Sequence, residues 1–208
     1  MKNDRSMYSV HPTVSYVATM LRNLPDRTGK TLAEWKNVIS AGGPTGQKEI
    51  VVWLKSNHDL GGTTANLVAG AATGQDPEKY DEDHYLTMAV DFVSTMYNGK
   101  KSHLRPMHDV LISRIAELGD DVRLSPTKTF VPAYRNRVFA QIKPATLSRI
   151  DVGFALKGYT DVLPDRLIAT DGLKKGDRIT HRIPVAAVAE IDSELDRWLH
   201  VAYSLDGK

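Results

Sequence analysis

A basic stretch in the second half of the chain offers the residue types that bind phosphate groups. No acidic residue lies between Asp121 and Asp151. The basic residues of this interval are Arg123, Lys128, Arg135, Arg137, Lys143 and Arg149, and its aromatic residues are Phe130, Tyr134 and Phe139. Lysine and arginine attract phosphates, and aromatic rings stack on nucleobases or other flat groups. The stretch therefore predicts a binding surface for an anionic ligand, with nucleic acid as one candidate.

A β-sheet would sort these side chains onto two faces, because alternate residues of a strand point to opposite sides. One face would carry Arg137, Phe139, Gln141 and Lys143, and the other would carry Val138, Ala140 and Ile142. If the aliphatic row packs on helices, the cations face water. We predict the following ligand-binding residues: Lys128, Tyr134, Arg135, Arg137, Lys143, His181 and Arg182. The alternative is a solvated face whose charges keep edge strands from pairing with other chains.

An enzyme with its site at a domain junction is a second hypothesis. Its candidate polar residues are Lys128, Tyr134, His181 and Arg182, which would meet if the last strand lies beside the first hairpin. Because triads are recognised by geometry, the sequence alone identifies no hydroxyl–His–carboxylate set. We therefore predict no catalytic residue.

Two short motifs that resemble catalytic sequences lack essential parts. Gly29-Lys30-Thr31 resembles the end of a phosphate-binding loop, but Leu24 stands where the first glycine is required. Thr31 and Glu34 instead have the spacing of a helix capping box. Ser125 and Lys128 match S-x-x-K, although Pro126 spoils the helical turn on which that chemistry depends.

Metal and cofactor binding are not indicated. The seven histidines form no H-E-x-x-H motif, and the chain has no cysteine. Asp81, Glu82, Asp83 and His84 form a polar run typical of the solvated start of a helix. We expect no metal and no cofactor.

The apolar pattern predicts short helices in the first half and strands in the second. Leu32, Trp35, Val38 and Ile39 form one helical stripe, and further stripes follow up to Tyr97. The predicted strands contain apolar positions alternating with polar or small ones: 127–143 as a hairpin, 149–156, and 179–183. Amphipathic helices are expected after Pro106 and over 188–202.

These patterns predict an α+β protein with two domains. Residues 1–98 would form a small all-helical domain, and residues 99–208 an antiparallel sheet packed with helices. The boundary is placed at Asn98-Gly99-Lys100-Lys101, where the last helix of the first half stops.

Composition narrows the remaining classes. The 27 basic and 25 acidic residues give a net charge of +2, which favours no partner by itself. No apolar run reaches the roughly 20 residues of a membrane helix, and no secretory signal is recognisable, so a cytoplasmic location is expected. A protein-interaction or homo-oligomer module is a third hypothesis, although Trp35, Trp53 and Trp198 fit core positions better than an interface.

Several segments resemble a two-domain bacterial family of unknown function. The helical half carries Thr28-Gly29-Lys30-Thr31 followed by Glu34-Trp35. The second half carries Phe139-Ala140-Gln141-Ile142-Lys143-Pro144 and Thr180-His181-Arg182. The resemblance covers nearly the whole chain and implies no established activity.

Overall fold

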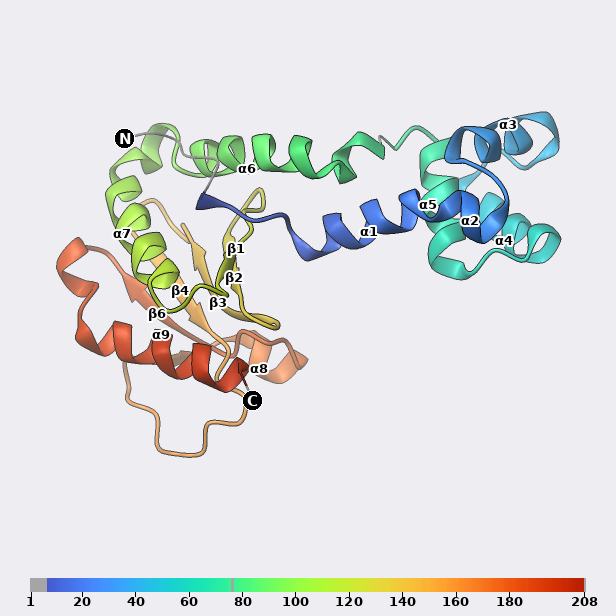
Figure 1. Ribbon diagram of the computed structural model, residues 1–208. Helices are drawn as coiled ribbons and strands as arrows, with labels where there is room; N and C mark the ends of the chain where they lie inside the picture. The colour runs from blue at the N-terminus through green and yellow to red at the C-terminus, as the bar shows by residue number, and fades with distance from the viewer. Residues whose placement is uncertain (1–6, 76, 208) are drawn as a thin grey trace. The chain divides into compact units, whose positions relative to one another are not determined.

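The protein is described by a computed structural model that covers residues 7–75 and 77–207 (Figure 1). Contacts divide the described chain into a helical unit, residues 12–85, and a C-terminal unit made of residues 7–11 and 86–207. The boundary predicted at residues 98–99 concerns which segments fold independently, and it stays a prediction.

The helical unit is built from short amphipathic helices. They are α1 (Pro12–Arg22), α2 (Leu24–Thr28), α3 (Leu32–Gly42), α4 (Gln47–His58), α5 (Gly62–Ala72) and the beginning of α6 (Glu82–Met96), with a 3₁₀ turn at Pro77–Tyr80. Its buried side chains include Leu24, Trp35, Ile39, Ile50 and Leu54.

The predicted capping box at the start of α3 is confirmed. The Thr31 side chain accepts a hydrogen bond from the Glu34 backbone N–H, and the Thr31 N–H donates to the Glu34 carboxylate over 2.7 Å. Gly29 ends α2 with φ +72°, which glycine adopts without a steric penalty. Thr28 accepts a hydrogen bond from the Trp35 indole over 2.9 Å, so this segment is part of the helical core.

The C-terminal unit combines helices with a sheet, as the sequence predicts. The helices are the end of α6, then α7 (Arg105–Ala116), α8 (Asp171–Lys175) and α9 (Ser193–Asp206), with 3₁₀ turns at Gly99–Leu104 and Val188–Glu190. The strands are β1 (Arg123–Leu124), β2 (Val131–Tyr134), β3 (Val138–Lys143), β4 (Ile150–Phe154), β5 (Ile168–Ala169) and β6 (His181–Val185).

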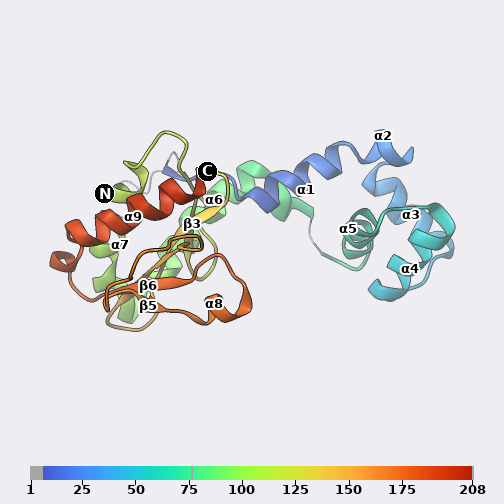
Figure 2. The same cartoon turned by 90° about the horizontal axis from the view of Figure 1, so that it is seen from below.

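The sheet has the order β1-β2-β3-β4-β6-β5, and every neighbouring pair is antiparallel. The segment between β4 and β6 therefore contributes β5, which lies at one edge of the sheet. It is followed in the chain by α8 (Figure 2). The two-residue strands β1 and β5 and the helix α8 lie outside the predicted elements.

One face of the sheet packs against α7 and α9 to form the core of the unit (Figure 1). From the sheet, Ile142, Val152 and Ile183 are fully buried, and Leu111 and Trp198 approach them from the helices. Burying such a side chain stabilises the fold by roughly 1.5–3 kcal/mol. The α+β class is confirmed. Within the described ranges no helix has both the length and the apolar character needed to cross a membrane.

Candidate functional site

The face of the sheet opposite α7 and α9 carries polar side chains and is hollowed. Its residues come from four neighbouring strands: Pro132 and Tyr134 of β2, Gln141 and Lys143 of β3, Asp151 and Gly153 of β4, and Arg182 of β6. Because these residues alternate with the buried apolar positions, the same strands build the core and the open face.

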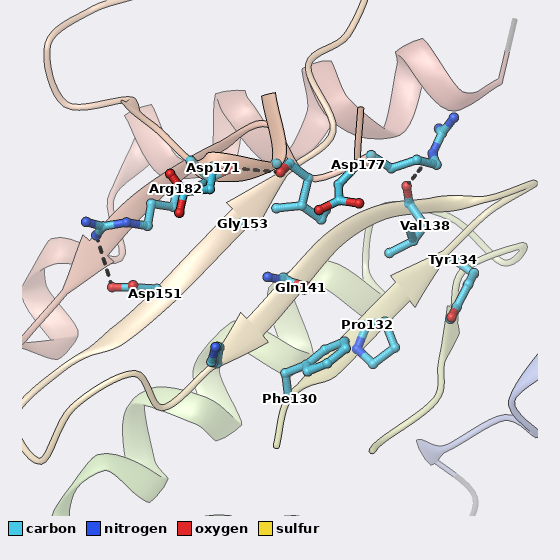
Figure 3. A pocket seen from close by; sticks show the side chains of 15 residues that line it. Phe130, Pro132, Tyr134, Val138, Gln141, Asp151, Gly153, Asp171, Asp177 and Arg182 are labelled. Carbon is cyan, nitrogen blue, oxygen red and sulfur yellow. Dashed lines mark hydrogen bonds and ion pairs between the residues drawn. The ribbon is translucent and has the colours of Figure 1, made fainter. Parts of the chain in front are cut away.

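This open face forms the floor of a pocket of about 470 Å³, which we name the sheet pocket (Figure 3). Its described lining residues are Phe130, Pro132, Tyr134, Val138, Gln141, Lys143, Asp151, Gly153, Thr170, Asp171, Gly172, Asp177, Arg178, Ile179 and Arg182. Figure 3 shows Phe130 and Pro132 on one side, Asp171 and Asp177 on the other, and Gln141 between them.

The wall of the sheet pocket is the segment 170–179. Thr170 donates from its hydroxyl to the Ile179 carbonyl over 2.8 Å, and the Asp177 N–H donates to the Gly172 carbonyl over 2.9 Å. Ile179 lies directly over Gly153: a Cβ at position 153 would come within 2.6 Å of the Ile179 Cγ2. The wall can therefore sit close to the sheet because position 153 has no side chain.

One end of the sheet pocket is cationic. The Asp151 carboxylate accepts hydrogen bonds from Arg149 over 2.9 Å and from Arg182 over 3.2 Å. Lys143 is the cross-strand neighbour of Asp151 in the β3–β4 register. Two guanidinium groups thus share one carboxylate, and Lys143 adds a third cation on the neighbouring strand, so positive charge is in excess at this end.

A second hollow of about 510 Å³, which we name the lysine groove, lies beside the end of β3. Lys100, Lys101, Lys128 and Lys143 line it, and none of its described lining residues is acidic. The Lys101 ammonium donates to the Pro144 carbonyl over 2.7 Å, which fixes that side chain at the rim. Since Lys143 lines both hollows, the lysine groove and the cationic end of the sheet pocket form one basic surface.

We name this surface the basic band. Its members are Lys100, Lys101, Lys128, Lys143, Arg149 and Arg182. The band holds six cations and one carboxylate, Asp151, although the whole chain has a net charge of only +2. Positive charge is therefore concentrated here, and a concave surface of one sign attracts oppositely charged ligands.

The structure brings some of the predicted ligand-binding residues together and separates others. Lys128 and Lys143 line the lysine groove, and Tyr134, Lys143 and Arg182 line the sheet pocket. His181 is buried on the helix-facing side with Ile183, where its Nδ1 lies 3.0 Å from the Thr180 hydroxyl. Burial lowers the pKa of His181. The four residues of the enzyme hypothesis therefore do not share one site.

Arg135 and Arg137 lie at the turn between β2 and β3, and neither lines the two hollows. The Arg135 guanidinium donates to Asp121 over 2.8 Å and stacks over the Tyr203 ring at 4.2 Å. The Arg137 backbone N–H donates to Asp206. Arg135 is thus occupied by partners within the chain.

Tyr134 has a partner outside the sheet. Its hydroxyl lies 3.1 Å from Nε2 of His11, and the two rings meet edge to face at 5.7 Å. Burial raises the pKa of Tyr134, against the lowering influence of Arg123, and burial lowers the pKa of His11. At neutral pH the pair is therefore a phenol beside an uncharged imidazole.

The expected distribution of β3 side chains is wrong at two positions. Phe139 is completely buried and packs edge to face on Tyr203 of α9 at 5.6 Å, whereas Val138 lines the sheet pocket. The reason is a β-bulge: Ala133 pairs with Ala140 and Tyr134 pairs with Val138, which leaves Phe139 as an extra residue. A bulge shifts the alternation by one residue, so Phe139 joins Ala140 on the helix-facing side.

Lys100 and Lys101 of the lysine groove were missed by the sequence reasoning. They belong to the Asn98–Lys101 segment, which follows a helix and whose sequence predicts a domain boundary. Their partners Lys128 and Lys143 are far away in the sequence. In the local sequence, the signal for this site is two adjacent lysines directly after a helix. Among the described residues, no cluster of three or more potential metal ligands is found.

Comparisons with known proteins agree with the resemblance inferred from the motifs. The model of the family described as "Domain of unknown function (DUF5655)" matches residues 93–206, and that described as "Domain of unknown function (DUF4287)" matches residues 17–74. Neither the search of curated proteins nor that of solved structures gave a match. Since the first match spans more than half of the 208 residues, the chain belongs to the DUF5655 family and carries a DUF4287 region before that domain.

Proposed function

We propose that the C-terminal unit is a binding module for a polyanion, and that this polyanion is nucleic acid. The observation that carries the proposal is the position of Lys143, which joins a four-lysine groove without carboxylates to a pocket end with three cations around Asp151. A continuous basic surface of this kind binds successive phosphates through charge, whatever the base sequence.

The charges of the basic band are available to a ligand to different degrees. Lys128 and Lys143 are exposed, and neither side chain has a hydrogen-bond or ion-pair partner among the described residues. Arg149 and Arg182 share one carboxylate. By contrast, Arg135 and Arg166 are held by Asp121 and by Asp192 with Glu194. Lys128 and Lys143 thus present free cations at the two hollows, whereas the guanidinium groups of Arg135 and Arg166 are paired.

The shape of the basic band favours a nucleic-acid strand as its ligand over a flat anionic surface such as a membrane. Both hollows are concave, with volumes of about 510 and 470 Å³. The aromatic side chains of Phe130 and Tyr134 line the sheet pocket. A positively charged groove combined with aromatic side chains is the usual arrangement for single-stranded nucleic acids.

Fluorescence anisotropy with labelled single- and double-stranded oligonucleotides, measured over a salt series, tests the proposal. We expect log K to fall linearly with log salt, by about 0.7 per phosphate contact for a single strand. The double variant Lys128→Gln/Lys143→Gln should bind more weakly, and its salt slope should be smaller by about 1.4.

The matched control is Lys36→Gln/Lys157→Gln, which removes the same charge from exposed positions that line neither hollow. It should bind like the wild type. Undetectable binding at low salt, or equal weakening by the control, would remove nucleic acid as the ligand.

A further inference from the structure

The sheet pocket has a second, oppositely charged end that polyanion binding does not explain. Asp171 and Asp177 project from the wall, and neither carboxylate has a hydrogen-bond or ion-pair partner among the described residues (Figure 3). Two free carboxylates repel a simple anion, and the cluster of Lys143, Arg149 and Arg182 repels a simple cation. The pocket therefore fits a ligand that is itself bipolar.

We infer that the sheet pocket receives one base of a single-stranded nucleic acid held by the basic band, and that this base carries an amino group, as adenine, cytosine and guanine do. The inference rests on the proposed function and names its ligand more closely. A nucleotide has the required polarity: its phosphate is an anion, and its amino-bearing edge donates hydrogen bonds.

The size and lining of the pocket suit a flat ring. A volume of about 470 Å³ lies within the range of small-ligand sites. Phe130 and Pro132 form one side of the pocket, where a ring can stack, and Ile179 covers the floor at Gly153. Bases stack on aromatic side chains because every base has a π-face.

The carboxylates of Asp171 and Asp177 would discriminate between bases that carry an amino group and bases that do not. An ionised carboxylate only accepts hydrogen bonds, so it favours the amino groups of adenine, cytosine or guanine. The corresponding position of thymine or uracil is a carbonyl oxygen, which a carboxylate repels. The Gln141 side chain lies between the two sides and has both donors and an acceptor, so it can form hydrogen bonds with the other polar atoms of the base.

Hydrogen bonds fix the backbone of the wall that carries these carboxylates. The Thr170 N–H donates to the Thr180 carbonyl over 2.9 Å, and the Asp177 N–H donates to Gly172 over 2.9 Å. Arg178 anchors the same segment through the Val138 carbonyl over 3.0 Å and through Asp206. A site whose groups are already positioned loses less entropy on binding. A base in a duplex has its amino edge paired, so the ligand is a single strand.

The test uses fluorescence anisotropy to titrate the full chain against three homopolymers of twelve nucleotides, (dA)12, (dC)12 and (dT)12, and compares their affinities. We expect (dA)12 and (dC)12 to bind about fivefold or more tightly than (dT)12. The variant Asp171→Asn/Asp177→Asn should abolish that preference without weakening (dT)12 binding. The control variant Asp161→Asn/Asp165→Asn changes two exposed carboxylates outside the pocket and should keep it.

The outcomes separate this inference from the proposed function. Salt-dependent binding with equal affinity for the three homopolymers overturns the pocket inference and leaves the basic band as a polyanion site. Absence of binding to every oligonucleotide overturns the proposed function. Displacement of labelled (dC)12 by free CMP but not by TMP supports the pocket, and CMP binding without any oligonucleotide binding identifies the ligand as a free nucleotide.

Discussion

The two faces of the sheet use neighbouring residues of the same strands for different purposes. On the helix-facing side, Ala140, Ile142 and Val152 are completely buried in apolar surroundings. On the open side, Lys143 and Asp151 remain in contact with water. The comparison teaches that the core and the proposed binding surface use different side chains, although positions of the two kinds are adjacent in the chain. Substitutions should therefore change stability and the proposed binding separately. The predictions below test that separation, in order of decreasing effect on the free energy of unfolding.

Phe139→Ala should have the largest effect. The side chain is completely buried against Tyr203, and removing a buried phenylalanine costs about 3–5 kcal/mol. Urea denaturation measures the loss. The control is Val138→Ala, its neighbour on the open face, which should cost much less. Equal losses for the two variants would contradict the bulge and the assignment of faces.

Asp206→Ala should have the second largest effect on stability, because Asp206 connects α9 to the β2–β3 turn and to the wall of the sheet pocket. Its buried carboxylate accepts hydrogen bonds from the Arg137 N–H and from Arg178, which anchors the wall of the sheet pocket. The Arg178 side chain is 38% exposed, so the loss comes from the charged hydrogen bonds of Asp206, which contribute about 1.5–3 kcal/mol each.

Asp196→Ala on the same helix is the comparison for Asp206→Ala, because it breaks an exposed ion pair with Arg114 over 3.0 Å. It should cost less than about 1 kcal/mol. If both variants lose the same stability, the Asp206 network does not hold the wall.

Stability should fall at acidic pH because of His108 on α7. The side chain is completely buried against Tyr97, with Arg105 and Asp109 nearby. Burial, with a smaller contribution from Arg105, lowers the pKa of His108 to about 3. An unfolded histidine titrates near 6.5, so the unfolded state takes up the proton first and stability is lost as the pH falls from 6.5 towards 3.

The expected loss between pH 7 and pH 5 is about 2 kcal/mol, from 1.36 kcal/mol per unit of pKa difference. Urea midpoints at the two pH values measure it. His108→Leu should remove most of this pH dependence. A wild-type protein that is equally stable at pH 5 and pH 7 would show that His108 is solvated in the folded state.

Lys143→Gln should have the smallest effect on stability and a clear effect on binding. An exposed substitution of this kind changes the free energy of unfolding by less than about 0.5 kcal/mol. Because Lys143 lines both hollows, the salt slope of oligonucleotide binding should fall by about 0.7. A large loss of stability would mean that the two faces are not separable at this position.

The regular parts of this fold could be predicted from the sequence. The alternation of Ile150, Val152 and Phe154 marks β4, and the stripe through Leu195, Trp198, Leu199 and Ala202 marks α9. Both patterns follow from burying one side of a regular element. The α+β class and the capping box at Thr31 follow from the same reasoning.

The candidate site could be predicted only in part. Lys128, Tyr134, Lys143 and Arg182 lie at the two hollows, whereas the other predicted residues, Arg135, Arg137 and His181, do not line them. A bulge leaves no mark in an alternating pattern, so Phe139 was placed on the wrong face. Likewise, nothing local indicates that the wall segment crosses the open face or that Lys100 approaches Lys128.

The missing side chain at Gly153 has a consequence for how this family can diversify. A Cβ there would meet Ile179 at 2.6 Å and the Gln141 Cγ at 2.9 Å, so even alanine would require one of these neighbours to shift. Such a replacement would move the wall away from the sheet or displace Gln141, and it would alter no charge. Relatives with a larger residue at this position should therefore hold the wall farther from the sheet while keeping the same charges around the pocket.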